Sequence, residues 1–261
     1  MGAEVSVVIP IFNEARVLPA TLEQLALRFH STATEIFLVD DGSTDDSAGL
    51  AEHLVRDLPQ FEVLRLPVNM GKGAALRAGI ARTTSACVIF MDADLSTSLD
   101  GLDSVINGLD DYDIVIGSRS IPGSVVKRSS PLRTAMGRTF NRLMRWSTGL
   151  PVHDSQCGFK AFRGDVARLL FSLSTCDRFA FDPEILRLGT ALGYTVKEVP
   201  VLWVAGDHSA VRPIRDSVRT AVDLIPIRAR TRAKRIRDLA SRSSLPVPPP
   251  AANPFDHHRH G

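Results

Sequence analysis

Two aspartates stand one residue apart directly after an apolar run, and their types and spacing suit metal binding. Residues 86–91 read ACVIFM, and Asp92-Ala93-Asp94 follows at once. If the run is a strand, the backbone leaves the pleat at Asp92, so both carboxylates can turn toward the same point. Carboxylate oxygens are ligands that Mg²⁺ and Mn²⁺ prefer where the ion also bridges to phosphate oxygens. The couplet therefore predicts a divalent-cation site.

Polar and acidic side chains also follow three other predicted strands. They are Asn13 and Glu14 after residues 5–10, Asp40 and Asp41 after residues 35–39, and Asn69 to Lys72 after residues 61–66. Ligands of open parallel sheets bind beyond the carboxyl ends of the strands, so we expect these side chains to share a cleft with the couplet. The first strand is followed by PIFNE and not by GxGxxG, and Gly71-Lys72 lacks the rest of a P-loop. Those two kinds of nucleotide site are therefore excluded.

Strand and helix patterns alternate over the first 117 residues, which predicts an α/β fold. Apolar, strand-like runs occupy residues 5–10, 35–39, 61–66, 86–91 and 112–117. Helical patterns occupy residues 13–29, 46–57, 71–82 and 99–109. Further apolar runs at 158–162 and 195–204 flank a helical pattern at about 182–192. Continuous apolar strands separated by helices indicate a mostly parallel sheet with helices on both faces.

The composition is that of a folded, soluble core. Of the 261 residues, 44% are hydrophobic and 23% are charged, which argues against a disordered chain or a coiled coil. The chain contains no run of about 18 consecutive apolar residues, so the sequence predicts no membrane-spanning helix. The start of the chain lacks the pattern of a secretory signal, so we expect a cytoplasmic protein. The three cysteines form no CxxC pair, which favours reduced thiols over a disulfide framework or a zinc site.

Charge is distributed unevenly along the chain. Residues 212–242 hold ten Lys or Arg and three Asp, whereas the whole chain carries a net charge of only +2, so residues 1–211 are net acidic. Within residues 119–148, basic residues and apolar residues at helical spacing predict a basic amphipathic segment. Residues 243–261 are proline-rich and are predicted to be disordered. We expect a catalytic domain at 1–211 and a basic amphipathic arm at 212–242, which favours a polyanionic partner.

Six segments, in order along the chain, resemble one family. They are VVIPIFNE (7–14), LVDDGSTD (38–45), NMGKGAALRAG (69–79), MDADLS (91–96), VIGSR (115–119) and DSQCGFKAF (154–162). Together they resemble the polyprenyl-phosphate glycosyltransferases of glycosyltransferase family 2, in particular the dolichyl-phosphate glucosyltransferases. The resemblance spans residues 5–205 and implies the GT-A fold. It also implies that a sugar passes from a nucleotide-sugar donor to a polyprenyl phosphate with inversion at the anomeric carbon.

The resemblance implies roles for the residues at the strand ends. The residues that would bind the nucleotide part of the donor are Pro10, Phe12, Glu14 and Asp41. Lys72 would approach the donor phosphate, since the glycines on either side of it permit a close approach of the backbone. Asp92 and Asp94, joined by Gln156, would hold Mg²⁺ or Mn²⁺ and thereby the diphosphate leaving group.

The acceptor side of the site is implied by residues further along the chain. Arg119 would bind the donor or the acceptor phosphate in a forked contact, and Arg133 is a second candidate for the acceptor phosphate. Asp154 is the candidate general base, although a phosphate that is already ionised needs none. A hydroxyl acceptor, such as a growing polysaccharide, would need one. Asp154→Asn is therefore expected to abolish transfer to a hydroxyl and to spare transfer to a phosphate.

Several alternatives stay open. The forms DADLS and QCGFK favour UDP-glucose as the donor, with GDP-mannose or another nucleotide sugar as alternatives, and a sugar-binding scaffold as the non-enzymatic one. The basic segments favour peripheral association with an anionic membrane surface. Nucleic acid is not expected as a partner, because it would leave the carboxylates at the strand ends unexplained and the arm offers few aromatic residues for stacking. The oligomeric state is left open.

Overall fold

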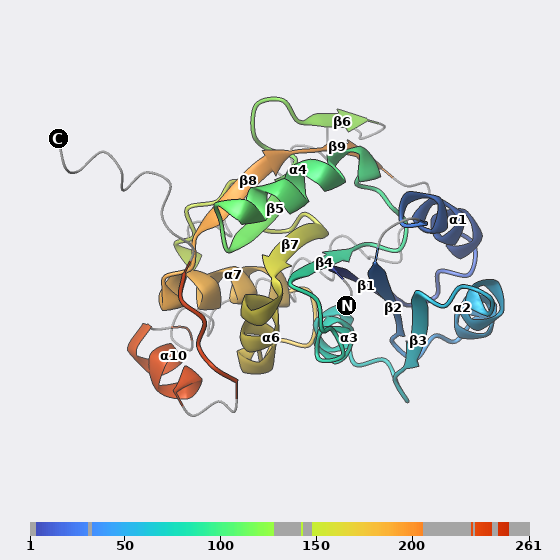
Figure 1. The fold of residues 1–261 in the computed structure, drawn as a ribbon, viewed down its shortest axis with the longest axis horizontal. Helices are drawn as coiled ribbons and strands as arrows, with labels where there is room; N and C mark the ends of the chain where they lie inside the picture. Colours follow the sequence, from blue (N-terminus) through green and yellow to red (C-terminus); the bar gives the residue numbers. More distant parts are fainter. Residues whose placement is uncertain are drawn as a thin grey trace.

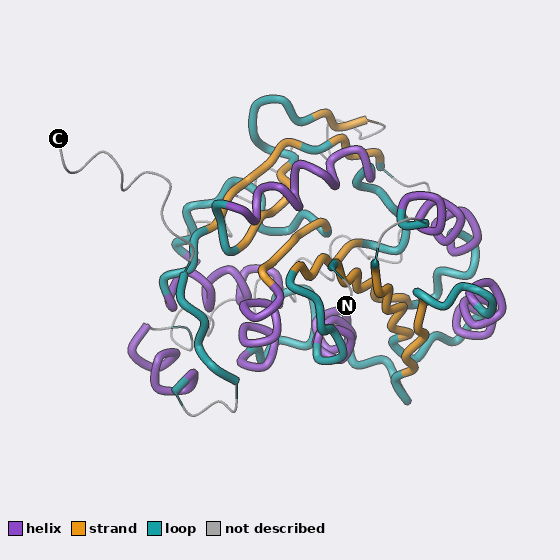
Figure 2. Tube along the Cα trace, in the orientation of Figure 1, coloured by secondary structure: helices purple, strands orange, loops and turns teal. Residues whose placement is uncertain are grey.

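The computed structural model describes residues 4–30, 33–127, 142, 148–205, 231, 233–241 and 245–250. A seven-stranded sheet runs through the middle of the molecule, and helices lie on both sides of it (Figures 1 and 2). The α/β architecture with a mostly parallel sheet that the sequence predicts is thereby confirmed.

The strands of the large sheet lie in the order β3-β2-β1-β4-β7-β5-β8. Their bounds are β1 Val5–Ile11, β2 Thr34–Asp40, β3 Phe61–Arg65, β4 Cys87–Met91, β5 Ile114–Ser118, β7 Phe159–Arg163 and β8 Val196–Pro200. Only β7 is antiparallel to its neighbours, β4 and β5. A separate two-stranded sheet pairs β6 (Val125–Lys127) with β9 (Leu202–Val204). The carboxyl ends of β1, β2 and β4 therefore meet at one edge, where the candidate site lies.

Helices cover both faces of the large sheet. One face carries α1 (Leu18–Arg28), α2 (Ser47–Val55) and α4 (Leu102–Asn107), which is flanked by the short 3-10 turns η1 (Leu99–Gly101) and η2 (Gly108–Asp110). The other face carries α3 (Lys72–Ile80), α6 (Gly164–Leu173) and α7 (Phe181–Leu192). The last helix, α10 (Ala233–Ala240), packs on α6 and α7. The sheet and the helices on its two faces thus form a rigid support for the loops that follow β1, β2 and β4.

Alternating side chains of the buried strands fill the two cores. Val7 and Ile9 of β1 pack on the α1 side and Val8 packs on the α3 side, as the two-residue period of a strand requires. Phe90 of β4 packs in the core on the α3 side, where the centre of its ring lies 6.0 Å from that of Phe162 and 5.8 Å from that of Phe181. Burial of such apolar surface is the main favourable contribution to folding, so both cores stabilise the strands that end at the site.

The structure contains elements that the sequence patterns did not predict. The helix α6 and the short strand β6 were not expected, and β7 was expected only as an apolar run. The antiparallel insertion of β7 between β4 and β5 depends on long-range pairing, which a local pattern does not encode. The insertion brings the start of the DSQCGFKAF segment next to the aspartate couplet.

The C-terminal segment 245–250 lies against the domain. The hydroxyl of Tyr194 donates a hydrogen bond to the carbonyl oxygen of Pro248 at 2.9 Å, and Arg163 donates one to the carbonyl oxygen of Pro249 at 2.8 Å. Leu245 packs on the α3-side core. For residues 245–250 this differs from the disorder expected over 243–261, because proline-rich backbone lacks internal hydrogen bonds and leaves its carbonyl groups free to accept from side chains. The rest of that range lies outside the described residues.

The amphipathic segment expected at residues 119–148 and the arm expected at 212–242 lie mostly outside the described residues. Of the arm, α10 is described, and it buries Ile236 and Ala240 against the domain. Across the described ranges, no helix combines the length and the apolar character needed to cross a bilayer.

Candidate active site

Lys72 and Asp92 form the central ion pair of the candidate site. Asp92 follows β4 directly, and Lys72 begins α3 after Gly71, whose φ of 111° is unfavourable for other residues. The Lys72 Nζ lies 2.5 Å from Asp92 Oδ1 and 5.7 Å from the centre of the Phe181 ring. Burial alone would lower the pKa of Lys72, but the adjacent Asp92 carboxylate raises it overall. Lys72 is therefore charged and held at the couplet.

The glycines beside Lys72 have a structural role that differs from the expected one. A Cβ atom at Gly71 or Gly73 would meet the backbone carbonyl groups of Asp177 and Cys176. The glycines thus let the segment before α7 pack against the first turn of α3. This close packing by itself requires the absence of side chains at these two positions.

Asp94 is oriented by the turn that follows it. Its two carboxylate oxygens accept hydrogen bonds from the Ser96 backbone N–H at 2.9 Å and from the Ser96 hydroxyl at 2.7 Å. Leu95 has a φ of 45°, a conformation that is uncommon for a residue with a branched side chain. The turn fixes Asp94, whose charge acts on Glu14 together with that of Asp92, and it leaves each Asp94 oxygen a lone pair for a further partner.

Glu14 reports the negative potential of the site. Burial, and then the charges of Asp94, Asp92 and Asp45, raise its pKa to about 7. Its position is fixed by the turn after β1, where the Glu14 N–H donates to the Ser47 hydroxyl at 2.8 Å. A carboxylate whose pKa is raised by burial and by neighbouring negative charges marks a place where a cation is electrostatically favourable.

The loops after β1 and β2 join on the same side. Asp41 is buried and accepts hydrogen bonds from the Met70 N–H at 2.7 Å, the Gly71 N–H at 2.8 Å and the Asn69 amide at 3.0 Å. Pro10 and Phe12 are half-buried at the end of β1. The structure therefore brings the predicted donor-binding residues together, and Asp41 also fixes the turn that leads to Lys72.

Arg119 and Asp154 form a second ion pair, after β5. The Arg119 backbone N–H and side-chain Nε donate to Asp154 Oδ2 at 3.0 and 2.7 Å, and Nη2 donates to Oδ1 at 2.9 Å. The guanidinium carbon also lies 5.6 Å from the Trp203 ring centre. Glu198 of β8 supports the pair, because its carboxylate accepts from the Asp154 backbone N–H at 3.0 Å. Arg119 is thus rigidly placed, with its Nη1 edge outside the contact with Asp154.

The general-base role that the sequence suggested for Asp154 does not fit this geometry. Asp154 is fully buried, and although burial alone would raise its pKa, the Arg119 guanidinium lowers it to about 2. A carboxylate with so low a pKa is a weak base, and its oxygens already accept hydrogen bonds from Arg119 and from the Gln156 N–H. Asp154 is better described as the residue that positions Arg119. Asp154→Asn would therefore disturb Arg119 whatever the acceptor, so that substitution does not separate a phosphate from a hydroxyl acceptor.

Gln156 and Gly158 form the opposite wall. A Cβ atom at Gly158 would collide with the Asp92 carboxylate, so this glycine permits the wall to touch the couplet. The Gln156 Nε2 is buried and has no hydrogen-bond partner in the part of the chain that the structure describes. A buried donor without a partner is costly, which indicates that a ligand oxygen satisfies it.

The donor set fits a divalent cation. Asp92 and Asp94 supply carboxylate oxygens, and Gln156 can add an amide oxygen on rotation of its terminal amide. Within the described residues there is no cluster of three or more His, Cys, Asp or Glu side chains arranged to hold a metal. The set therefore suits an ion that completes its coordination with substrate phosphate oxygens and water, as Mg²⁺ commonly does.

Sequence reasoning missed a buried pair behind the site. Lys160 of β7 donates to Asp182 Oδ1 and to the Cys157 carbonyl oxygen, both at 2.5 Å, and both charged side chains are almost fully buried. The Asp182 charge also acts on Lys72, where it favours the charged form. The place of Lys160 in the DSQCGFKAF segment was a sequence signal that could have marked it as a site residue. No such signal marks its partner Asp182, which lies 22 residues later. Arg133 lies outside the described residues.

Comparison with known proteins decides the family. The family model described as glycosyl transferase family 2 matches residues 6–171. The chain belongs to glycosyltransferase family 2. A dolichyl-phosphate beta-glucosyltransferase of Trichomonas vaginalis is 33% identical over 84% of this chain and 69% of its own length. The dolichyl-phosphate beta-glucosyltransferase of Dictyostelium discoideum is 32% identical over 86% and 74%.

The fold of this glycosyltransferase is also that of solved structures. The glucosyl-3-phosphoglycerate synthase of Mycobacterium tuberculosis, crystallised with Mn²⁺, UDP and phosphoglyceric acid, superposes with a TM-score of 0.63 at 20% identity, covering 87% of this chain and 78% of the other. The resemblance to GT-A glycosyltransferases that the six segments implied is therefore confirmed, and the residues at the carboxyl ends of β1, β2 and β4 belong to a transferase.

Proposed function

We propose that this glycosyltransferase moves glucose from UDP-glucose to a polyprenyl phosphate at a membrane surface, and that it uses Mg²⁺ or Mn²⁺. The observation that carries the proposal is the ion pair of Lys72 with Asp92, close enough to Asp94 and to Arg119 for their charges to interact, with the Arg119 guanidinium held by Asp154. The similarity to dolichyl-phosphate beta-glucosyltransferases supports the lipid phosphate and the glucose.

Different residues would bind different parts of the nucleotide-sugar donor. Asp92, Asp94 and Gln156 would hold the cation, which when bound neutralises charge on the leaving diphosphate. Lys72 would supply a second positive charge to the diphosphate. Asp41, Pro10, Phe12 and Glu14 would enclose the nucleoside. These contacts orient the anomeric carbon for attack from the opposite side.

The acceptor phosphate needs little activation. The second pKa of a phosphate monoester is about 6, so its oxygen is a nucleophile at neutral pH without a general base. Arg119 would bind that phosphate with the edge that faces away from Asp154, and Arg133 is a further candidate. The ion pair that engages Asp154 favours this acceptor over a hydroxyl, since a hydroxyl would have to give up a proton.

A ligand panel and a transfer assay test the proposal. Thermal unfolding is measured with UDP, GDP and their glucose and mannose conjugates, with and without Mn²⁺, and we expect the largest stabilisation with UDP-glucose and Mn²⁺. Transfer of labelled glucose is then measured with polyprenyl phosphate in vesicles and with a soluble hydroxyl acceptor. Stabilisation by none of the nucleotides, or transfer to the hydroxyl acceptor alone, would contradict the proposal.

A further inference from the structure

The segment 174–180, between α6 and α7, borders the site and has no role assigned so far. It begins after residue 171, where the match to the family model ends. Figure 1 shows α6 between α3 and α7, and the segment that joins α6 to α7 passes the first turn of α3. There the Ala74 N–H donates a hydrogen bond to the Asp177 carbonyl oxygen at 3.1 Å.

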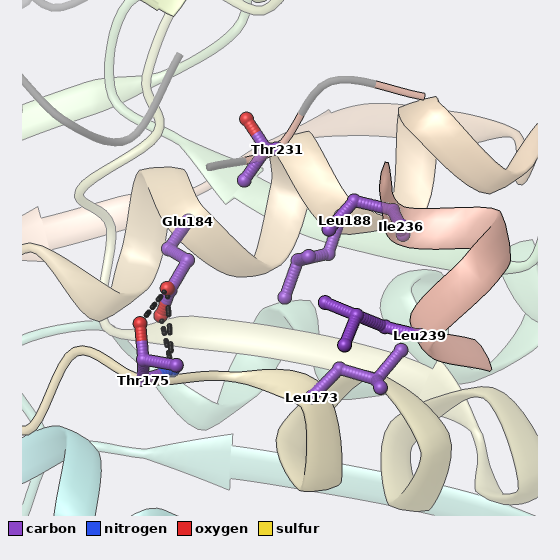
Figure 3. Close-up of a pocket in the computed structure, with 7 residues that line it drawn as sticks. All are labelled: Leu173, Thr175, Glu184, Leu188, Thr231, Ile236 and Leu239. Carbon is purple, nitrogen blue, oxygen red and sulfur yellow. Dashed lines mark hydrogen bonds between the residues drawn. The ribbon is translucent and has the colours of Figure 1, made fainter. Parts of the chain in front are cut away.

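A buried carboxylate holds the start of this segment. Glu184 of α7 accepts hydrogen bonds from the Ser174 hydroxyl at 2.6 Å, from the Thr175 N–H at 3.0 Å and hydroxyl at 2.8 Å, and from the Cys176 N–H at 2.9 Å. Figure 3 shows Glu184 joined to Thr175 at the edge of a cavity of about 320 Å³. The backbone of residues 174–176 is thus fixed by α7.

A second set of contacts holds the middle of the segment against α3. Arg77 of α3 pairs with Asp177 at 2.9 Å, and Gly71 and Gly73 leave room for the carbonyl groups of residues 176–177. Thr175, Asp177 and Arg178 are exposed in this segment, and the first two bind Glu184 and Arg77. A loop fixed from two helices thus presents the third, Arg178, at a defined place.

Arg178 lies beside the turn that Asp41 fixes. Its Cγ would be 2.9 Å from a Cβ atom at Gly71. Burial raises the pKa of Asp41, and Arg178 is close enough that its charge acts in the opposite direction. Arg178 is exposed, and no carboxylate among the described side chains lies within salt-bridge distance of it. Lys72 and Arg119, in contrast, are each paired with an aspartate.

The spacing of the strands places Arg178 at the nucleoside end of the donor. Asp41 follows β2 and Asp92 follows β4, and β1 lies between these strands, so the two strand ends are about 10 Å apart. A diphosphate held at Asp92 and Lys72 would therefore place the nucleobase near Asp41. Asp41 Oδ1 accepts one hydrogen bond within the described chain, from the Met70 N–H, and keeps a lone pair for a base N–H.

We propose that Arg178 is a nucleotide-binding residue, which donates hydrogen bonds to a carbonyl oxygen of a pyrimidine base beside Asp41. An acceptor at Asp41 next to a donor at Arg178 matches a base edge with an N–H flanked by carbonyl groups, as in uracil. The inference rests on the proposed nucleotide-sugar donor. It adds a binding residue from outside the family's matched region and a reason for the two-sided anchoring of segment 174–180.

The test compares Arg178→Met with Arg82→Met, an exposed arginine that pairs with Glu62 at the other end of α3. Affinities for uridine, UMP and UDP are measured by calorimetry and ligand-observed NMR, with Mn²⁺ present. We expect Arg178→Met to weaken all three ligands by a similar factor, about tenfold or more, because the lost contact is to the base that they share. Arg82→Met should bind all three as the parent does, and both variants should unfold at the parent's temperature.

Three other outcomes would be informative. If Arg178→Met binds uridine as the parent does but binds UDP more weakly, Arg178 contacts phosphate and the assignment to the base is overturned. If all three affinities equal those of the parent, Arg178 is an ordinary surface residue and the inference fails. If the parent protein itself binds none of the three, the failure is that of the proposed nucleotide donor.

Discussion

Asp92 and Asp94 differ in their surroundings although one residue separates them. Asp92 is engaged by the Lys72 ammonium, whereas Asp94 accepts only from Ser96 among the contacts described. Asp94 can therefore bind a cation without displacing another positive charge. The sequence predicts the couplet, but the asymmetry between its members depends on α3, which approaches from 20 residues earlier.

We predict that Asp94→Asn removes most activity without unfolding the protein. An amide supplies less negative charge than a carboxylate, so Mn²⁺ should bind more weakly and transfer should slow by about 100-fold or more. Mn²⁺ affinity is measured by electron paramagnetic resonance and transfer by a labelled-sugar assay. Asp111→Asn, at an exposed position after η2, serves as the control. Unchanged Mn²⁺ affinity in Asp94→Asn would contradict the metal assignment.

A second prediction concerns Asp154, whose role changed between sequence and structure. Its lowered pKa of about 2 means that its ion pair with Arg119 stabilises the fold above pH 4 and that this contribution is lost as the pH falls toward 2. Asp154→Asn should therefore lower the free energy of unfolding at pH 7 by about 3–5 kcal/mol, because it leaves Arg119 unpaired. Denaturant unfolding is measured from pH 7 to pH 3. The difference in the free energy of unfolding between Asp154→Asn and the parent should become smaller below pH 4.

The same variant distinguishes a positioning residue from a base. Asp154 does not titrate near neutral pH, so the dependence of the transfer rate on pH between 6 and 9 should keep its shape in Asp154→Asn while the rate falls. A change in the shape of that profile would restore Asp154 as a proton acceptor. Glu198→Gln keeps a side-chain oxygen that can accept from the Asp154 N–H. Its transfer rate should therefore fall less than that of Glu198→Ala.

At the scale of elements, buried strands could be predicted because continuous apolar runs fix them locally. The runs ending at Pro10 and Val39 lie within β1 and β2, and the run 86–91 exceeds β4 by one residue at its start. The helix α6 was missed because it starts directly after β7 with no capping side chain at Arg163, so the change of period had no boundary signal. The pairing of Lys160 with Asp182 could not be read locally either, since it requires β7 and α7 to be placed side by side.

The segment 245–250 carries a prediction about pH. Burial raises the pKa of Tyr194 to about 12, above the value of about 10 for an unfolded chain. The neutral hydroxyl that binds Pro248 thus stabilises the fold below pH 10, and this contribution is lost as the pH rises toward 12. Tyr194→Phe should lower the free energy of unfolding by about 1 kcal/mol at pH 8. The difference in that free energy between variant and parent should become smaller above pH 10.

Tyr112→Phe is a matched control, because Tyr112 is the other tyrosine of the chain. Its ring faces Lys197, and its hydroxyl is not part of the contact with segment 245–250. Urea unfolding at pH 8, 10 and 11 is followed for the parent and both variants. A constant gap between Tyr194→Phe and the parent across this range would contradict the proposed anchor.

At the scale of the whole molecule, an acidic domain is joined to a basic C-terminal arm. The carboxylates converge at the ends of β1, β2 and β4, where they suit a cation and a diphosphate. The basic residues gather in 119–148 and 212–242, of which α10 is the main described part. We expect this separation of charge to let the basic segments bind a second polyanion while the acidic site binds its own ligands.

The arm therefore predicts binding to anionic membranes that weakens with salt. Each basic residue near such a surface contributes about 1 kcal/mol, so changing Arg230 and Arg232 to Gln should weaken partitioning by about 30-fold at low salt. Cosedimentation with vesicles that contain phosphatidylserine measures this. Neutral phosphatidylcholine vesicles should bind weakly, and raising the salt above 0.1 M should reduce the difference between parent and variant, because the Debye length falls below about 10 Å. Changing Arg56 and Arg82 to Gln removes the same charge from the domain, and that variant should partition as the parent does if the arm, and not net charge, provides the contact.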